Sequence, residues 1–430
     1  MQCGASTHVR PVALNRIGSG RVRKDKDRLT KLVRTLIHFI FDWGPACGGP
    51  FTTVKHFLGA AESLDWEWGL VSIDSNREPK QPREPENEGN HHQILRLTAK
   101  DGYFAEAYRV PARFCLEELR ERVARADVVF IHMLYRYHVG LACELSERLG
   151  KPVVIVPHGG LDPYCFTYRS FRKRAWLSFH FRHMKKAWFL FATDAERRKA
   201  MSQVKWISSD RTRIINWPVS HDGVQELAVG SAEDIFRTTT RKLLFAGRLH
   251  PMKRIIETVA AFRDIQPPGW ELVIAGPESK EVRLADVIRH SGPAYGRSIH
   301  YVGFLNPGEL RWVSQRCDAF VLASHRENFG NSVAEAMIAG LGVGISDGVD
   351  IHELVSRRKC GIVSHITGKN DVRKLLTSLC ALPRDELKGM GLRGRAAAAK
   401  AFSFEQFASA LRDFVETVVA DSGVGSSKSF

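Results

Sequence analysis

The sequence has little of what marks a metal-binding, secreted or membrane-spanning protein. Its 8 cysteines stand singly, and no two have the C-x-x-C spacing of zinc sites and redox motifs. We therefore expect reduced thiols, as in a cytoplasmic protein. No apolar run reaches the roughly 18–20 residues that a membrane-spanning helix needs. Residues 1–27 contain no apolar stretch of the kind found in secretory signals.

Acidic residues are also few relative to basic ones. The chain contains 63 lysines and arginines but 47 aspartates and glutamates, which gives a formal net charge of +16. A basic surface attracts nucleic acids, anionic lipids or phosphorylated small molecules. The charge is densest in 168–188, where basic and aromatic residues are interleaved and no acid is present. This segment fits two interpretations equally: a core helix with a solvated basic face, or a patch that binds an anionic membrane.

Apolar runs of strand length alternate with helical segments along both halves of the chain. Because such runs between helices are typical of parallel sheets covered on both faces, we predict an α/β fold. A length of 430 residues is too great for one ordinary core, which indicates two doubly wound, Rossmann-like domains. The predicted strands are 32–40, 70–75, 126–133, 151–159, 187–193, 212–218, 242–249, 270–276, 299–305, 317–324 and 343–347.

The composition also predicts the domain boundaries, with a linker between the two domains near 219–240. The predicted parts are a basic, disordered arm (1–28), an N-terminal domain (29–220) with a polar, proline-rich loop (76–92), a C-terminal domain (221–400), a C-terminal helix (401–420) and a flexible tail (421–430).

Two glutamates eight positions apart follow the predicted strand 317–324. Ligands of doubly wound sheets bind at the carboxyl ends of the strands, and Glu327 lies at such an end. A short loop containing Gly330 leads from it into a helix that carries Glu335, and the free N–H groups at a helix start suit a phosphate. Alternatively, Ser332 and Glu335 have the S-x-x-E spacing of a helix capping box. A glycosidase-like carboxylate pair is a further alternative, since the loop leaves open the distance between the two carboxylates.

The segment 323–347 resembles the E-x7-E signature of glycosyltransferase family 4, which comprises retaining enzymes with the GT-B fold. The motif S-x-x-E-N-F-G-N-x-x-x-E-A-M-x-x-G is present in full. The resemblance implies that Glu327 holds the donor sugar and stabilises positive charge at its anomeric carbon. It also implies that Glu335 binds the ribose. The remaining loop residues implied in substrate binding are Asn328, Phe329, Gly330 and Asn331.

Three other stretches are similar to motifs of the same family. The sequence FAGRLHPMKRI resembles its G-R-L-x-P-x-K loop, so Arg248 and Lys253 are implied in binding the donor diphosphate. The sequence GGPFTTV resembles the N-terminal glycine loop, where Gly48 and Gly49 let the backbone approach donor or acceptor. The sequence PHGGLDP makes His158 a catalytic candidate that contacts the donor sugar or its phosphate.

The resemblance implies a hexosyltransferase that moves a sugar from a UDP- or GDP-sugar to a glycan or lipid-linked acceptor in cell-surface polysaccharide or lipopolysaccharide biosynthesis. The family pattern implies no cofactor and no metal, since the nucleotide-sugar is a co-substrate. It also implies that a helix within 402–418 crosses back onto the N-terminal domain. We expect the protein to be cytoplasmic or peripheral on the inner face of the cytoplasmic membrane, with 168–188 as its membrane contact.

The sequence departs from the family pattern at three places. Gly340-Leu341-Gly342-Val343 lacks a proline that family members commonly carry, Arg254 stands where glycine is often found, and residues 1–28 have no recognisable counterpart. Two alternatives to a glycosyltransferase stay open. One is a GT-B sugar-nucleotide epimerase or a non-catalytic homologue. The other is a basic nucleic-acid-binding protein, although the sequence contains none of the helix-turn-helix, zinc-finger or RNA-binding motifs.

Overall fold

The computed structural model describes residues 33–41, 43–44, 48–74, 93–98, 116–167, 170–219 and 230–423. The arm 1–28, the loop 76–92, residues 220–229 of the linker and the end of the tail lie outside these ranges, so the predictions made for them stay predictions. The part of the predicted linker from Gly230 to Arg237 is a helix, α7. Both sheets described below belong to the unit 34–430 of the chain.

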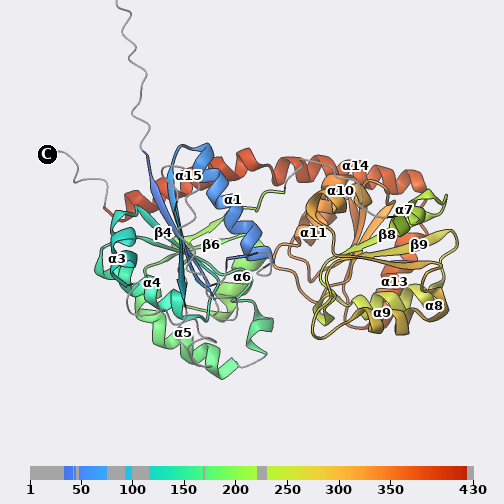
Figure 1. Ribbon diagram of the computed structural model, residues 1–430, viewed down its shortest axis with the longest axis horizontal. Helices are drawn as coiled ribbons and strands as arrows, with labels where there is room; N and C mark the ends of the chain where they lie inside the picture. Colours follow the sequence, from blue (N-terminus) through green and yellow to red (C-terminus); the bar gives the residue numbers. More distant parts are fainter. Residues whose placement is uncertain are drawn as a thin grey trace, which may run out of the picture. The chain divides into compact units, whose positions relative to one another are not determined.

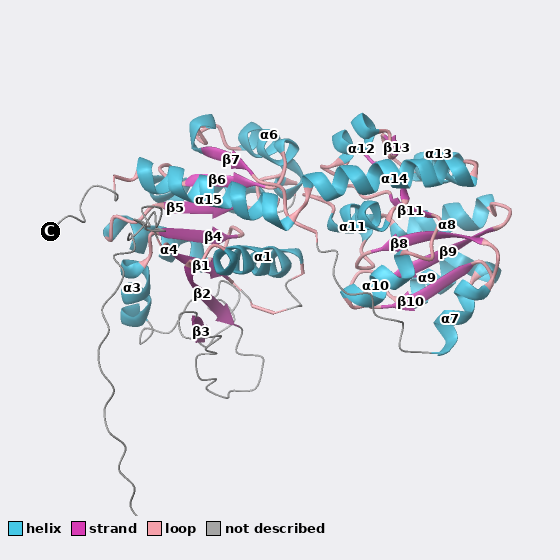
Figure 2. Ribbon diagram, turned by 90° about the horizontal axis from the view of Figure 1, so that it is seen from above, coloured by secondary structure: helices cyan, strands magenta, loops and turns pink. Residues whose placement is uncertain are grey.

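The N-terminal domain is built on a parallel sheet (Figure 1), whose strand order β3-β2-β1-β4-β5-β6-β7 can be followed in Figure 2. Its central strands β4 and β5 are buried along their whole length, which explains their continuous apolar sequences VVFIH and VVIV. The strands are β1 (Thr35–Ile40), β2 (Glu67–Asp74), β3 (Gln93–Thr98), β4 (Val128–His132), β5 (Val153–Val156), β6 (Trp188–Phe191) and β7 (Thr212–Ile214).

The C-terminal domain is built on a second parallel sheet with the order β10-β9-β8-β11-β12-β13. Strands β11 and β12 are again buried throughout. The strands are β8 (Arg241–Ala246), β9 (Trp270–Ala275), β10 (Ile299–Gly303), β11 (Ala319–Leu322), β12 (Gly342–Ser346) and β13 (Gly361–Ser364). Every strand pair is parallel, so the prediction of two doubly wound α/β domains is confirmed.

Helices connect successive strands and cover the sheets (Figure 2). Those of the N-terminal domain are α1 (Gly49–Ser63), α3 (Leu116–Arg125), α4 (Tyr137–Arg148), α5 (Ser170–Met184) and α6 (Asp194–Gln203). Those of the C-terminal domain are α7 (Gly230–Arg237), α8 (Ile255–Ile265), α9 (Leu284–Ser291), α10 (Pro307–Ser314), α11 (Asn331–Ala339), α12 (His352–Arg358), α13 (Lys369–Cys380) and α14 (Arg384–Ala401).

The last helix, α15 (Phe404–Asp421), returns to the N-terminal domain, as the sequence predicts for 402–418. Its Phe407 packs edge-on against Phe57 of α1 with ring centroids 5.2 Å apart, and Glu416 forms an ion pair with Arg34. The preceding α14 packs instead on α11 and β12 of the C-terminal domain. The pair α14–α15 is therefore a covalent connection between the domains in addition to the linker near 219–240.

The predicted strands match observed ones, but β3 and β13 were not predicted. The sequence QILRLT of β3 contains three polar residues and follows a stretch predicted as a long polar loop, and β13 has only the four residues GIVS. Both lie at a sheet edge, where one neighbouring strand is absent and a short or mixed sequence suffices. None of the helices in the described ranges is long and apolar enough to cross a bilayer.

A chain of three imidazoles runs through the core of the N-terminal domain. His38 Nδ1 lies 3.0 Å from His132 Nε2, and His132 Nδ1 lies 3.1 Å from His158 Nε2. His38 and His132 have no exposed surface. Burial lowers the pKa of His38 to about 3 and that of His132 well below its usual value, because a charged imidazole is costly away from water. The chain therefore stays neutral in the folded protein at neutral pH.

The lowered pKa values predict that acid destabilises the fold. Between about pH 6.5, the ordinary histidine pKa, and pH 3 the unfolded chain binds protons that the folded protein does not, so the free energy of unfolding falls as the pH falls. In His38→Asn, an amide group takes the place of the ring atom Nδ1, and the protein loses one histidine whose pKa is lowered by burial. We expect the slope of unfolding free energy against pH to become shallower by about 1.4 kcal/mol per pH unit between pH 4 and 6. Urea unfolding at a series of pH values measures this, and parallel slopes for the two proteins would contradict it.

Candidate active site

A cleft of about 390 Å³ lies between the carboxyl ends of the two sheets. All of the predicted site residues line it except Gly48, which immediately precedes the lining residue Gly49. The predicted residues in the lining are Gly49, His158, Arg248, Lys253, Glu327, Asn328, Phe329, Gly330, Asn331 and Glu335. The structure thus brings together side chains that are up to 286 positions apart in the sequence, from Gly49 to Glu335.

Lys253 and Glu327 form an ion pair in this cleft, with Lys253 Nζ 2.6 Å from Glu327 Oε1. They meet because β8 and β11 are neighbours in the sheet, and each residue lies in the segment that follows the carboxyl end of its strand. The hydroxyl of Ser324 donates a second hydrogen bond to the same carboxylate oxygen at 3.0 Å. Both charged side chains keep some exposure, at 18% and 20%, so the pair faces the open cleft.

The backbone of Glu327 is also fixed. Its N–H donates to the carbonyl of Gly348 at 2.9 Å, and its carbonyl accepts from the N–H of Asp350 at 3.0 Å. A Cβ at Gly348 would lie 2.4 Å from the carbonyl oxygen of His325, so only glycine permits this approach of the two loops. The turn after β12 therefore holds the Glu327 loop in place.

Helix α11 begins directly after this loop, and Gly330 is its N-cap residue with a φ of 92°. A Cβ at Gly330 would lie 2.7 Å from Val349 Cγ1, so a side chain at this position would be both strained and crowded. No side chain of the described residues caps the helix, and Ser332 is its second residue. The capping-box alternative for Ser332 and Glu335 is therefore wrong, and the start of α11 is left open toward the cleft, where its N–H groups suit an anion.

Phe329 differs from its neighbours because its side chain is 4% exposed and packs on Phe402, with ring centroids 5.0 Å apart. Its part in the cleft is consequently limited to its backbone. The aromatic pair anchors the loop to the segment between α14 and α15, which connects the two domains.

Glu335 projects from α11 into the cleft, where it has no hydrogen-bond partner among the described residues. Desolvation by the surrounding protein atoms raises its pKa, while the positive charges of Arg311 and Lys253 oppose the rise. The side chain itself is exposed to the open cleft, so water counteracts this effect until a ligand fills the space. A ligand with hydroxyl donors would supply the hydrogen bonds that this carboxyl lacks.

Arg248 follows β8 and is exposed at the mouth of the cleft, without an ion-pair partner in the described part of the chain. Together with Lys253 it provides two cations close to the open start of α11. This combination of arginine, lysine and helix N–H groups is suited to a diphosphate.

The N-terminal domain contributes His158 and the start of α1. Gly48 has a φ of 70° and caps α1, and a Cβ at either Gly48 or Gly49 would meet no atom within 4 Å, so this side of the cleft is open. His158 has the left-handed φ of 49°, which is uncommon for a residue with a side chain and is a form of strain found at functional sites. Burial lowers the pKa of His158 to about 3, so it is a neutral hydrogen-bonding group.

The described residues contain no group of three histidine, cysteine, aspartate or glutamate side chains placed to hold a metal ion. The cleft instead offers two cations, two carboxyl groups, a neutral imidazole and a helix start. This arrangement can bind an anionic diphosphate and a polyhydroxylated group side by side. The individual roles assigned to these residues by the sequence stay predictions.

Residues 231–395 match the family model of glycosyl transferases group 1. The match covers the C-terminal domain and includes Arg248, Lys253, Glu327 and Glu335. This part of the chain is thus similar to glycosyl transferases group 1.

Two curated relatives are similar to this chain. This chain is 30% identical to the GDP-mannose:cellobiosyl-diphosphopolyprenol alpha-mannosyltransferase of Xanthomonas oryzae pv. oryzae over 263 residues. These residues are 60% of this chain and 65% of the relative. It is 27% identical to the protein of the same name from Xanthomonas campestris over 316 residues. These residues are 71% of this chain and 77% of the relative. The chain thus spans slightly less than two thirds of the first relative.

The fold of this chain matches solved structures over most of its length. Sucrose-phosphate synthase from Thermosynechococcus elongatus superposes with a TM-score of 0.70 at 16% identity, and the match covers 90% of this chain and 100% of that one. At this identity the likeness concerns the fold alone. The GT-B architecture implied by the sequence motifs is thereby confirmed.

Several residues of the cleft were not predicted from the sequence. Trp217 lies beside His158 with ring centroids 6.2 Å apart, and Gly276 and Phe304 follow β9 and β10. The rule that ligands bind after the strands would have identified the last two, since the strands themselves were predicted. Trp217 gave no such signal because the strand was predicted as 212–218, which includes it, whereas the observed β7 ends at Ile214. The other unpredicted lining residues are Pro50, Thr53, Ala246, Gly247, Ala275, Pro277, Leu305, Leu310 and Ser332.

The Lys253–Glu327 pair yields a direct test. In Lys253→Ala and in Glu327→Ala we expect turnover of a nucleotide-sugar to fall by roughly 10²–10³, because a preorganised charge aimed at the reacting group is lost. The melting temperature should change little, since both side chains face the open cleft. Lys388→Ala, which removes an exposed lysine of α14, is the control and should behave as the wild type. Near-normal turnover in both cleft variants would contradict the assignment.

Proposed function

We propose that this protein is a retaining glycosyltransferase that moves a sugar from a nucleotide-sugar to a glycan or lipid-linked acceptor, in cell-surface polysaccharide or lipopolysaccharide biosynthesis. The observation that carries the proposal is the Lys253–Glu327 pair at the open start of α11. It combines a cation for the leaving diphosphate with a carboxylate for the sugar, in a chain that is similar to glycosyl transferases group 1.

The C-terminal domain holds the donor. Arg248, Lys253 and the N–H groups at Gly330 bind the diphosphate, and they stabilise the negative charge that it gains as the leaving group. Lys253 then exchanges part of its contact with Glu327 for the diphosphate. Glu335 accepts hydrogen bonds from the ribose hydroxyls, which makes use of a carboxyl group without a partner in the described structure.

Glu327 and His158 act at the donor sugar. Glu327 accepts hydrogen bonds from sugar hydroxyls, and its negative charge stabilises the positive charge that develops at the anomeric carbon. His158 is neutral, because burial lowers its pKa to about 3, and it donates to or accepts from the sugar or its phosphate. No residue is assigned as a nucleophile. The main contribution of the protein is to position the two substrates.

For the donor we propose a GDP-sugar, with GDP-mannose as the first candidate, because both Xanthomonas relatives are named for this donor. A thermal-shift screen of GDP-, UDP- and ADP-sugars measures the preference, since a ligand that binds the native state raises the melting temperature. At a concentration 100 times Kd, binding adds about 2.7 kcal/mol. We expect GDP-mannose to give the largest shift. A larger shift with a UDP- or ADP-sugar would reassign the donor, and no shift with any of them would contradict the proposal.

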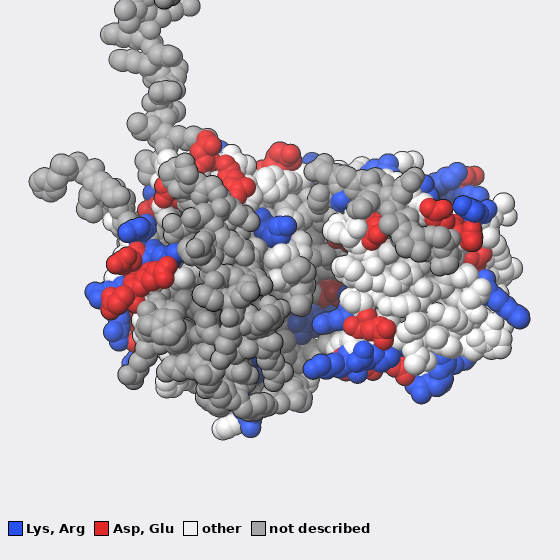
Figure 3. Space-filling model, viewed as in Figure 1, with Lys and Arg blue, Asp and Glu red and all other residues white. Residues whose placement is uncertain are grey.

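A second measurement separates transfer from the alternatives. A transferase releases nucleoside diphosphate from the donor faster when the acceptor is present. An epimerase releases it without acceptor, and a non-catalytic homologue releases none. On the face of the C-terminal domain that is visible in Figure 3, lysines and arginines are interspersed with acidic residues and do not form a continuous basic stripe. This distribution gives no support to the alternative of a nucleic-acid-binding protein.

We also propose that α5 rests on an anionic membrane, where a lipid-linked acceptor would be found. Its Phe171 and Phe179 are 83% and 78% exposed, whereas Leu177 and Met184 face the core. The helix carries Arg172, Arg174 and Arg182 and no acid. Exposed phenylalanines beside arginines favour an interfacial helix over a core helix with a merely solvated basic face.

Liposome co-sedimentation tests this membrane contact. Each cation near an anionic surface contributes about 1 kcal/mol, so binding should increase with the fraction of anionic lipid and decrease with salt. Phe171→Ser with Phe179→Ser should weaken binding, whereas Leu392→Ser, which removes an exposed leucine from α14, is the matched control. Binding that does not depend on anionic lipid, or that is equal in all three proteins, would contradict the membrane contact.

A further inference from the structure

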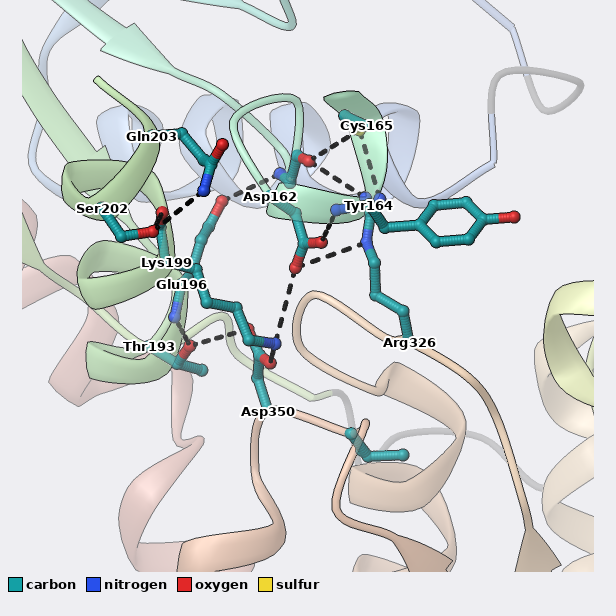
Figure 4. A network of polar contacts seen from close by, with 12 residues as sticks. Asp162, Tyr164, Cys165, Thr193, Glu196, Lys199, Ser202, Gln203, Arg326 and Asp350 are labelled. Carbon is teal, nitrogen blue, oxygen red and sulfur yellow. Dashed lines mark hydrogen bonds and ion pairs between the residues drawn. The ribbon is translucent and has the colours of Figure 1, made fainter. Parts of the chain in front are cut away.

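A network of polar contacts joins the two domains beside the cleft (Figure 4). Its centre is Arg326, the residue before Glu327. The guanidinium Nη2 donates to the carbonyl of Gly159 at 3.0 Å, and Nη1 donates to Cys165 Sγ at 3.2 Å. Its Nε lies 3.7 Å from Asp162 Oδ2. All three partners belong to the turn after β5 in the N-terminal domain, whereas Arg326 belongs to the C-terminal domain.

Gly159 is held from both sides. Its N–H donates to Glu196 Oε1 of α6 at 2.9 Å, and its carbonyl accepts from Arg326. Gly159 has a φ of 71°, and a Cβ there would lie 2.8 Å from Arg326 Nη2 and 3.0 Å from Asn328 Oδ1. The backbone of this turn and the loop that carries Glu327 are therefore in close contact. The residue before Gly159 is His158, so the contact fixes the turn that carries this side chain.

A second bridge lies next to the first. Lys199 Nζ of α6 is 2.5 Å from Asp350 Oδ1, and it also lies 3.5 Å from Asp162 Oδ2. Asp162 is thus shared by Arg326 and Lys199. Asp350 is 2% exposed at its side chain and donates its backbone N–H to the carbonyl of Glu327. Both bridges consequently end on the Glu327 loop or on the turn that supports it.

We propose that Arg326 is a positioning residue that docks the His158 turn of the N-terminal domain against the Glu327 loop and so assembles the two halves of the active site. The His158 turn and the Glu327 loop each carry one of the groups proposed to act on the donor sugar. Because they belong to different domains, contacts between the domains are needed to set the position of one relative to the other. The three contacts of the guanidinium lie along different directions. They are satisfied together only when the turn stands at one distance and one orientation from Glu327.

The chemistry of the side chain explains why an arginine is needed here. A guanidinium has five donors in a rigid planar fork, and it can reach a carbonyl, a thiol and a carboxylate together. A lysine offers one flexible ammonium group, which can pair with Asp162 but cannot hold all three partners in a fixed geometry. Partial burial, with 18% of the side chain exposed, protects these contacts from water. Arg326 is thus suited to fix the relative position of the two loops.

The inference rests on the proposed function, and its test uses the full chain with Arg326→Lys, Arg326→Met and Asp162→Asn. The asparagine keeps an oxygen for the N–H of Tyr164, which Asp162 caps at 2.9 Å, but it lacks the charge that faces Arg326. The matched control is Arg357→Ala, an exposed arginine of α12 in the same domain. Three quantities are measured: Kd for GDP by calorimetry, kcat for sugar transfer, and hydrogen–deuterium exchange of the segment 157–166.

We expect Kd for GDP to change by less than about twofold in every variant, because the groups proposed to bind the diphosphate and the ribose, Arg248, Lys253, the start of α11 and Glu335, all belong to the C-terminal domain. We expect kcat to fall by about 100-fold in Arg326→Met, since a misplacement of about 1 Å at the reacting groups has an effect of this size. Arg326→Lys and Asp162→Asn should lie between Arg326→Met and wild type. Exchange in 157–166 should increase in the same order, and Arg357→Ala should match the wild type in all three quantities.

Two results would overturn the inference. One is a kcat in Arg326→Met within a few-fold of wild type. The other is a loss of kcat that is accompanied by an equal loss of GDP binding and of melting temperature, which would indicate a general role in stability. Failure of the proposed function would look different: the wild type itself would bind no nucleotide and transfer no sugar. In that case the exchange of 157–166 still decides whether Arg326 docks the turn.

Discussion

The adjacency of β8 and β11 in the second sheet is the constraint on which the site depends. Parallel strands that are neighbours place their following loops side by side, and here these loops carry Lys253 and Glu327. The strand order changes direction at this pair, as it does at β1 and β4 in the first sheet. Such reversal points are where doubly wound sheets open a crevice at their carboxyl ends. The topology therefore creates a two-walled cleft, and the side chains give it its chemistry.

Strain accumulates at the same positions. His158 and Arg254 both have left-handed backbone conformations, with φ values of 49° and 52°. Glycine is often found at the position of Arg254 in the family that the sequence resembles, and the positive φ gives the physical reason. Arginine is tolerated here because its buried guanidinium is held by His325 Nδ1 at 3.0 Å and, more weakly, by the carbonyls of Ile366 and Thr367 at 3.4 Å. Strain of about 1–3 kcal/mol per residue persists only where such contacts fix the conformation.

The features of the site that lie close together in the chain could be predicted from the sequence. Glu327, Gly330 and Glu335 stand in one continuous motif, and their helix and strand are short-range features. The interdomain contacts could not be predicted. Arg326 and Asp162 are ordinary surface residues in the sequence, and their 3.7 Å approach depends on how two sheets face each other. Contacts within one domain can be as hard to predict: the buried carboxyl of Glu196 accepts the backbone N–H groups of Gly159 and Ala192 in its own domain, and burial raises its pKa to about 7. A sequence pattern with a period of two or 3.6 residues carries no information on contacts between domains.

The central claim is that one cleft holds the diphosphate of an activated sugar between the loop after β8 and the start of α11. The most direct measurement is a crystal structure of the protein with GDP. The account predicts electron density for the diphosphate within hydrogen-bond distance of Lys253 and of the N–H groups at Gly330, with the ribose hydroxyls at Glu335. A nucleotide bound elsewhere on the protein, with the Lys253–Glu327 pair unchanged and the cleft empty, would contradict it.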